Sequence, residues 1–88
     1  MTREFEIVNK LGLHARAAAK LVNEASRFGA EITLRHGDRS ANAKSIMSVM
    51  MLAASCGTTV EARAEGDDAE AALDALGALV ADRFGEGE

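Results

Sequence analysis

The amino-acid sequence predicts an α+β fold, an open-faced two-layer sandwich in which helices cover one face of a sheet. Stretches that alternate between polar and apolar residues, typical of half-buried strands, take turns with stretches whose apolar residues recur every three or four positions, typical of amphipathic helices. The resulting order is β-α-β-β-α-β-α. Alternation favours a mostly antiparallel sheet with one solvated face. With 88 residues, no proline and no linker-like tract, residues 1–88 are expected to form one domain.

The first half of the chain contains three expected strands and one expected helix. Arg3–Val8 alternates and is predicted to be the first strand. Ala15–Phe28 carries apolar residues at helical spacing and is predicted to be an amphipathic helix. Glu31–Arg35 alternates again, and a turn at residues 36–38, with His36 as a plain turn residue, leads into a weaker strand over Arg39–Ala43.

The second half contains two expected helices around one strand. Ser45–Ala54 is densely apolar, and its serine stands where a helix N-cap belongs. Thr58–Glu65 alternates and is predicted to be the fourth strand. The last helix is expected to open with a capping box between Asp67 and Glu70, and residues 85–88 are expected to fray. Its predicted buried stripe consists of Leu73, Leu76, Leu79, Val80 and Phe84.

Charge and composition exclude several classes of protein. Residues 1–60 hold eight Lys or Arg and five Asp or Glu, a net charge of +3, whereas residues 61–88 hold two and nine, a net charge of −7. The acidic end and the absence of Tyr and Trp argue against a nucleic-acid partner. No apolar run reaches the roughly 18 residues that cross a bilayer, so no membrane insertion is expected. A single cysteine, Cys56, and no visible signal peptide indicate the cytoplasm.

His14 is the main candidate for a functional residue. It stands between a loop around Gly12 and the expected helix, where unpaired backbone N–H groups and the helix dipole create a partly positive environment. Arg16 adds a permanent positive charge. This environment disfavours the imidazolium form and leaves a neutral, nucleophilic ring, and the backbone N–H groups of residues 15–17 suit a dianionic phosphate. Small alanines around the histidine are expected to leave it open to a large partner, as a phosphoryl carrier requires.

Other interpretations of His14 stay open on spacing alone. A loop residue with a capping role fits the same position. A metal site would need further ligands, and His36 and Cys56 share no ligand spacing with His14, so no metal and no cofactor is expected. A hydrolase would need an enclosed cleft and an orienting carboxylate, and residues 9–20 contain no acid.

Two segments in register resemble the HPr family, the histidine-containing phosphocarrier proteins of the bacterial phosphotransferase system. GLHARAAAKLV spans residues 12–22, and AKSIMSVMMLA spans residues 43–53. The resemblance extends over the whole chain in length, element order and both motifs. The residues themselves are most similar to those of proteobacterial members, including the nitrogen-related branch. It implies four antiparallel strands covered on one face by three helices.

The resemblance also implies a function and its residues. A phosphoryl group is accepted from phosphoenolpyruvate-charged enzyme I on Nδ1 of His14 and is passed to an enzyme II A component, so the protein is a carrier rather than an enzyme. Arg16 matches the family's active-site arginine and stabilises the phosphate. Ala17 stands where the family usually has proline, and it adds one N–H group that can join those of Ala15 and Arg16 in binding phosphate.

The second motif suggests regulation and docking. Ser45 is either a helix N-cap or, as in some family members, the target of an HPr serine kinase/phosphorylase. The methionines near it are either ordinary core or part of the docking surface that the family implies for enzyme I and its acceptors. That expected interface consists of Ala19, Met47, Met50 and Met51, whereas Ile46 and Val49 fit the core.

Two further interpretations belong to other classes of protein. The chain fits a regulatory protein-binding domain controlled by phosphorylation of Ser45, and less well a small-molecule-sensing domain, for which the sequence offers no enclosed pocket. Sugar transport and nitrogen regulation are not separated by the sequence. A shuttle between large partners is simplest as a monomer.

Overall fold

Four antiparallel strands form one sheet in the computed structural model, which describes residues 1–86. Along the sheet the order is β1-β4-β2-β3, so both edge strands pair on one side only. The bounds are Thr2–Glu6 for β1, Glu31–His36 for β2, Arg39–Asn42 for β3 and Thr59–Glu65 for β4.

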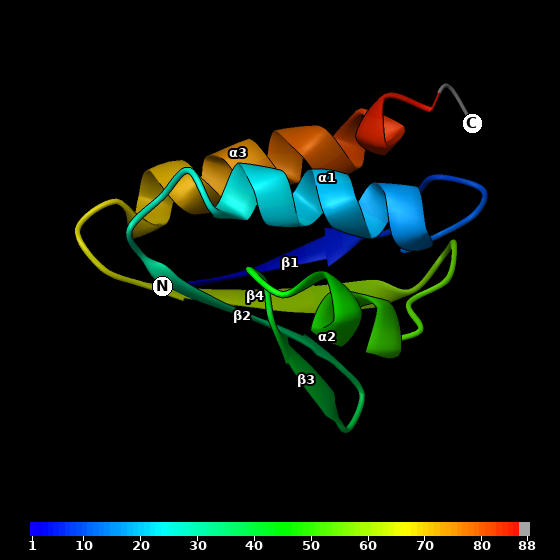
Figure 1. Cartoon of the computed structure of the whole chain (residues 1–88), viewed down its shortest axis with the longest axis horizontal. Coiled ribbons are helices and arrows are strands. Elements are labelled where there is room, and N and C mark those ends of the chain that lie inside the picture. The colour runs from blue at the N-terminus through cyan, green and yellow to red at the C-terminus, as the bar shows by residue number, and fades with distance from the viewer. Residues whose placement is uncertain (87–88) are drawn as a thin grey trace.

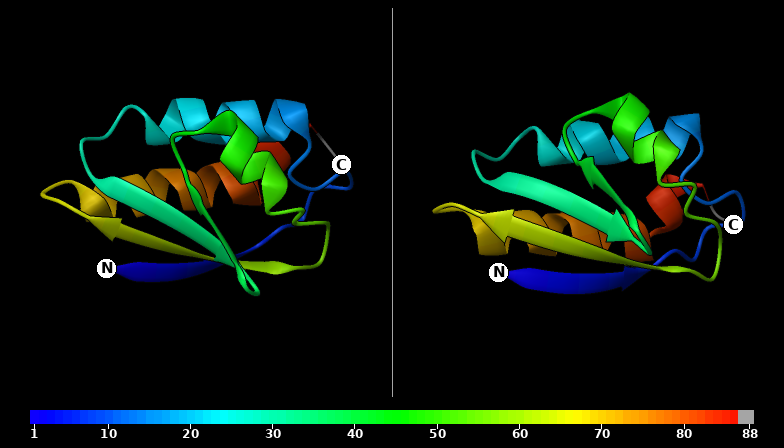
Figure 2. Two further views of the ribbon diagram at one scale, coloured as in Figure 1. Left: turned by 60° about the horizontal axis from the view of Figure 1, so that its bottom comes forward. Right: turned by 90° about the horizontal axis from the view of Figure 1, so that it is seen from below.

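Three α-helices cover one face of this sheet, as Figures 1 and 2 show. They are α1 over Ala15–Ala25, α2 over Ile46–Met51 and α3 over Ala69–Ala81, and a 3-10 turn, η1, follows at Arg83–Gly85. The α+β class, the order β-α-β-β-α-β-α and the open-faced sandwich are therefore confirmed. Within residues 1–86 no helix is long and apolar enough to cross a membrane.

The core lies between the sheet and the helices, because the alternation in the strands and the helical spacing place apolar side chains on facing surfaces. In β2, Ile32 and Leu34 are buried while the residues between and beside them are half-buried or exposed. Helix α3 approaches the sheet closely at Gly77, where an added Cβ would come within 3.2 Å of the Phe5 ring. A glycine that weakens the helix thus permits its contact with β1.

Two of the predicted helices are shorter than expected. The first ends at Ala25 rather than Phe28, and the second ends at Met51 rather than Ala54. After α2, Ala53 takes a left-handed conformation with φ 53°, which a helix cannot continue through. His36 is the last residue of β2, paired with Arg39, rather than a turn residue.

The start of α3 differs from the predicted capping box. Asp68, not Asp67, is the N-cap, and no side-chain capping bond forms there. The carboxylate of Asp68 instead accepts hydrogen bonds from the backbone N–H groups of Gly29 and Ala30, each at 2.8 Å, and so joins two loops. The pKa of Asp68 lies below its ordinary value. The hydrogen bond from Gly29 is the main cause, and the bonds from Ala30 and from the backbone of Asp68 itself, together with the charge of Lys44, add to it, while burial acts in the opposite direction.

The end of α3 also differs from the prediction. The helix stops at Ala81, and Phe84, expected to continue its buried stripe, lies instead in η1 and is fully buried there. Arg83 and Phe84 have φ values of 55° and 54°, which turn the chain back toward the start of α1. Fraying was expected for residues 85–88; Gly85 and Glu86 are instead part of this turn, and residues 87–88 lie outside the described part of the chain.

Candidate functional site

His14 is the N-cap residue of α1, with extended backbone angles of φ −73° and ψ 177°. The loop before it is held in place by the Leu13 N–H group, which donates to the Ala54 carbonyl at 2.9 Å. Gly12 has φ 68°, and an added Cβ would lie 2.6 Å from the same carbonyl oxygen. A glycine is therefore required where the loop passes the segment that follows α2.

The first turn of α1 leaves backbone donors open beside His14. The first helical bond runs from the Ala18 N–H group to the His14 carbonyl at 2.8 Å. The N–H groups of Ala15, Arg16 and Ala17 precede that bond, and the His14 side chain makes no capping bond to them. Of these three residues, Ala15 and Arg16 are exposed, whereas Ala17 is fully buried and its N–H group is closed to solvent.

A carboxylate that the sequence analysis did not include lies in this site. Oε2 of Glu86 contacts Nε2 of His14, and Oε1 of Glu86 accepts a hydrogen bond from Nδ2 of Asn9 at 3.0 Å. Residues 9–20 contain no acid, as the sequence shows, but the folded chain brings one to the histidine from residue 86. The sequence gives little indication of this contact. It depends on the left-handed conformations of Arg83 and Phe84, which reverse the chain ahead of Glu86 and which no sequence pattern near residues 85–88 predicts.

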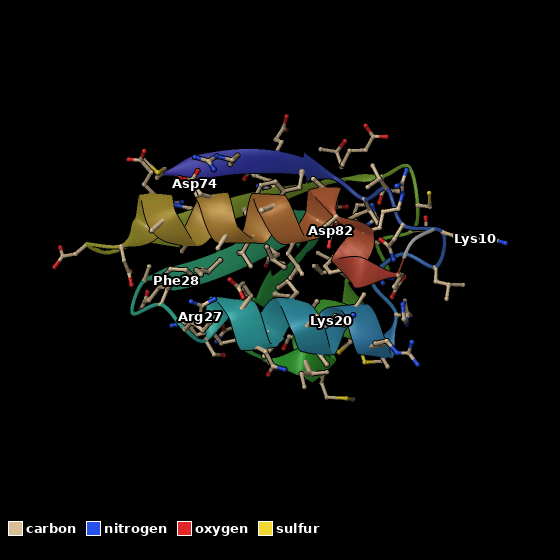
Figure 3. The ribbon with its side chains drawn as sticks, turned by 90° about the horizontal axis from the view of Figure 1, so that it is seen from above. Lys10, Lys20, Arg27, Phe28, Asp74 and Asp82 are labelled. Carbon is tan, nitrogen blue, oxygen red and sulfur yellow. The ribbon has the colours of Figure 1, made fainter. Side chains whose placement is uncertain are left out.

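Basic side chains surround this contact. His14, Glu86 and their neighbours line an open depression of about 600 Å³ together with Lys10, Arg16 and Lys20. Lys20 donates from Nζ to the Phe84 carbonyl at 2.5 Å, and Figure 3 shows Lys10 projecting from the loop before α1. The described part of this depression therefore carries three cationic residues and one acid, a balance that favours an anionic ligand.

The pKa of the Glu86 carboxyl is lowered. Burial opposes ionisation, but the hydrogen bonds from His14 and Asn9 and the charge of Lys20 outweigh it. Glu86 is therefore an ionised carboxylate that accepts hydrogen bonds and does not donate them.

The alanines around His14 have two roles. Ala15 is exposed and leaves the ring approachable, as expected. Ala17 and Ala18 are fully buried, so for them the expectation is wrong: their small side chains let α1 pack closely on the core. Arg16 is exposed on the first turn and is one of the residues that line the depression.

Ser45 is the N-cap of α2, and its Oγ accepts a hydrogen bond from the Ser48 N–H group at 3.4 Å. The helix it begins exposes Met47, Met50 and Met51, with Met47 70% and Met51 69% exposed. Val49 is buried as expected. Ile46 is 41% exposed and was wrongly predicted to be core, because α2 is short and turns a single residue, Val49, fully inward.

The remaining members of the expected interface and of the alternative metal site are also placed. Ala19 is half-buried on α1, which packs beside α2. His36 is linked through Nδ1 to the Leu52 carbonyl at 3.0 Å. Cys56 is exposed and unbonded. Within residues 1–86 no group of three or more His, Cys, Asp or Glu side chains is arranged to hold a metal ion.

Known proteins match the chain over its whole length. The family model described as PTS HPr component phosphorylation site matches residues 1–82. The phosphocarrier protein HPr of Cupriavidus necator is 52% identical over 88 residues, which cover 100% of this chain and 99% of that protein. The phosphocarrier protein NPr of Shewanella violacea is 49% identical over 86 residues, covering 98% and 94%. The crystal structure of HPr-C-His from Thermoanaerobacter tengcongensis superposes with a TM-score of 0.93 at 46% identity, covering 98% and 97%.

The fold and the site define a class of small α+β proteins that present a histidine at the start of a helix. About half of all residues are identical to those of the relatives, and the matches cover nearly complete chains. They therefore include the whole sheet and all three α-helices. The chain belongs to the HPr family, the phosphocarrier proteins of the phosphotransferase system.

Proposed function

We propose that His14 accepts a phosphoryl group on Nδ1 from phosphoenolpyruvate-charged enzyme I and passes it to an enzyme II A component. The observation that carries the proposal is that Nε2 faces Glu86, which leaves Nδ1 as the ring nitrogen without a described partner. Nδ1 is also the nitrogen nearer the main chain, so a phosphoryl group there lies close to the open N–H groups of α1. The residues expected to bind it are Ala15, Arg16 and Ala17.

In the proposed transfer, the Nδ1 lone pair attacks phosphorus while the bond from phosphorus to the donor's leaving atom breaks. Backbone N–H groups at the start of α1 and the Arg16 guanidinium neutralise the charge on the equatorial oxygens. No enclosed cleft is needed, because the acceptor histidine must meet two large partners in turn. This supports carriage of the group rather than its hydrolysis.

The exposed surface of α2 supports the proposed docking site for both partners. Met47, Met50 and Met51 are apolar, flexible and exposed, and side chains of this kind adapt to differently shaped partners. Ala19 on the neighbouring helix extends this surface.

We further propose that residues 1–88 act as one domain, as a monomer in the cytoplasm, where the exposed thiol of Cys56 stays reduced.

Incubation with phosphoenolpyruvate and enzyme I tests the proposal. Mass spectrometry is expected to show the gain of one acid-labile phosphoryl group, which His14→Ala loses completely. His36→Ala is the matched control, because His36 lies outside the depression, and it is expected to retain the gain. A phosphoryl group that still attaches to His14→Ala would refute the assignment.

A second candidate function is regulation through Ser45, on which an HPr serine kinase/phosphorylase would act. The observation that favours it is the position of Ser45 at the start of the exposed methionine helix, where a dianion would alter docking. A kinase adduct on Ser45 is stable in acid, so the same mass measurement after acid treatment separates the two sites. The choice between sugar uptake and nitrogen regulation depends on which enzyme II A component receives the group, and transfer assays with each decide it.

A further inference from the structure

The contact between Glu86 and His14 joins residues 72 positions apart in the sequence. We propose that Glu86 is a positioning residue for phosphoryl transfer, because in the neutral ring its carboxylate holds the proton of His14 on Nε2 and leaves the lone pair on Nδ1. The inference rests on the proposed function in one respect, that Nδ1 is the attacking atom. The assignment comes from hydrogen-bonding roles around the two side chains.

The proton in this contact is carried by His14. Glu86 is an ionised carboxylate and can only accept a hydrogen bond, so the proton in its contact with Nε2 belongs to the imidazole. A neutral imidazole carries one ring proton, and a proton on Nε2 leaves a lone pair on Nδ1. The contact therefore selects the tautomer that can attack phosphorus.

Asn9 holds the Glu86 carboxylate in place. Asn9 is fully buried, and its Nδ2 donates both to the Gly12 carbonyl at 2.8 Å and to Oε1 of Glu86 at 3.0 Å. The reversed amide would set its oxygen against two acceptors, so the orientation of Asn9 is fixed. Oδ1 of Asn9 has no partner among the described residues, which indicates that the side chain is placed for its donors.

A turn of unfavourable backbone conformation brings Glu86 to His14. Arg83 and Phe84 both adopt left-handed angles, which are unfavourable for residues other than glycine. The fully buried Phe84 ring and the Lys20 bond to the Phe84 carbonyl offset this strain. This unfavourable turn places the Glu86 carboxylate beside His14, where the glutamate side chain is 12% exposed.

Glu86 also lies beside the positive charge that develops on the His14 ring during transfer. When the Nδ1 lone pair forms the new bond to phosphorus, the ring becomes more positive while its Nε2 proton stays in place. The Glu86 carboxylate faces that proton and stabilises the developing charge. The donor's bond to phosphorus breaks in the same step, so no proton leaves the site.

Two substitutions at Glu86 test the inference. In Glu86→Gln, Asn9 is expected to donate to the glutamine oxygen, which turns the glutamine NH2 group toward Nε2. Nε2 must then accept, and the ring proton moves to Nδ1, the wrong tautomer for attack. Such an exchange beside a reactive histidine lowers the rate by up to about 10⁴-fold in known cases. Glu86→Ala removes the preference without reversing it.

The measurement is the tautomer of His14 in the unphosphorylated protein, read from the ¹⁵N chemical shifts of its ring nitrogens. The parent is expected to show the Nε2–H form, and Glu86→Gln a shift of about tenfold or more in the tautomer ratio toward Nδ1–H. Phosphoryl acceptance is expected to fall in the order parent, Glu86→Ala, Glu86→Gln. Glu4→Gln, the same exchange on the exposed side of β1, is the matched control and is expected to match the parent in both readouts.

An unchanged tautomer in Glu86→Gln, or a Glu86→Gln rate equal to or above that of Glu86→Ala, overturns the inference. The ¹⁵N spectra also report whether each variant is folded. If no variant, the parent included, accepts a phosphoryl group, the proposed function fails, whereas the tautomer measurement still decides what Glu86 does.

Discussion

Helices α1 and α2 both begin at a polar residue, and the two residues use that position in opposite ways. Ser45 turns its hydroxyl onto the Ser48 N–H group and caps its own helix. His14 makes no side-chain capping bond, and its ring contacts Glu86 from the far end of the chain. A capping side chain occupies the donors that an anion would use. Leaving them open costs α1 the stability of a cap and, under the proposed function, keeps donors available for phosphate.

The N-cap of α3 illustrates a third use of the same position. Asp68 leaves its own helix uncapped and instead binds the N–H groups of Gly29 and Ala30, which tie the loop after α1 to the start of α3. Capping, ligand binding and loop bracing are therefore separable properties, and substitutions can distinguish them.

The largest expected effect comes from removing the anchor that brings Glu86 to His14. Phe84 is fully buried, so Phe84→Ala is expected to lower the free energy of unfolding by about 3–5 kcal/mol. Urea denaturation measures this. Met47→Ala, at an exposed position, is the control and is expected to stay within about 0.5 kcal/mol of the parent. A loss below about 1 kcal/mol for Phe84→Ala would mean that the turn is not packed as described.

The next effect is a pH dependence at the brace formed by Asp68. Its pKa is lowered in the folded state, so its contribution to stability is fully present above about pH 4, the ordinary range of an aspartate, and is lost as pH falls through the folded pKa. Asp68→Asn is expected to destabilise the protein near neutral pH, and the gap to the parent should close in acid. Asp67→Asn, at the exposed neighbour, is expected to show no such gap. A difference in stability between Asp68→Asn and the parent that persists at low pH would show that the ionised carboxylate is not the cause.

A smaller effect is expected where the side chain does cap its helix. Ser45→Ala removes the bond to the Ser48 N–H group and is expected to cost about 1 kcal/mol in thermal unfolding experiments. Phosphoryl acceptance by His14 should be unchanged, because the two helix starts are separate sites. Loss of acceptance in this variant would contradict the contrast between the two positions.

The smallest effect is expected at Ala17, the position at which the sequence resemblance implies a proline. The N–H group of Ala17 precedes the first helical bond, so Ala17→Pro breaks none. The cost of fitting the ring at this fully buried position is offset in part by the preset φ of proline, and the net change in stability is expected to stay below about 1 kcal/mol. Ala18→Pro removes the bond to the His14 carbonyl and is expected to cost about 3 kcal/mol. Equal costs in the two variants would place the start of α1 elsewhere.

Periodicity predicted the strands and helices because a two-layer sandwich imposes the same burial pattern that the residues display. His14 and the donors of residues 15–17 were predictable for a similar reason, since they are neighbours in sequence. The Glu86 contact was not, because it depends on η1, where two residues without glycine's freedom adopt left-handed angles held by tertiary packing. The capping role predicted for Asp67 was wrong for a related reason. The N-cap is the neighbouring Asp68, and its carboxylate accepts hydrogen bonds from another loop, which the local sequence does not indicate.

The position of the phosphorus atom on the His14 ring tests the central claim most directly. Protein labelled with ¹⁵N in its histidines, charged by phosphoenolpyruvate and enzyme I, allows the N–P bond to be located by ³¹P–¹⁵N coupling. We expect the coupling at Nδ1 of His14, with Nε2 still carrying the proton that faces Glu86. A phosphorus bonded to Nε2 would contradict the account, because Glu86 would then occupy the place of the phosphoryl group.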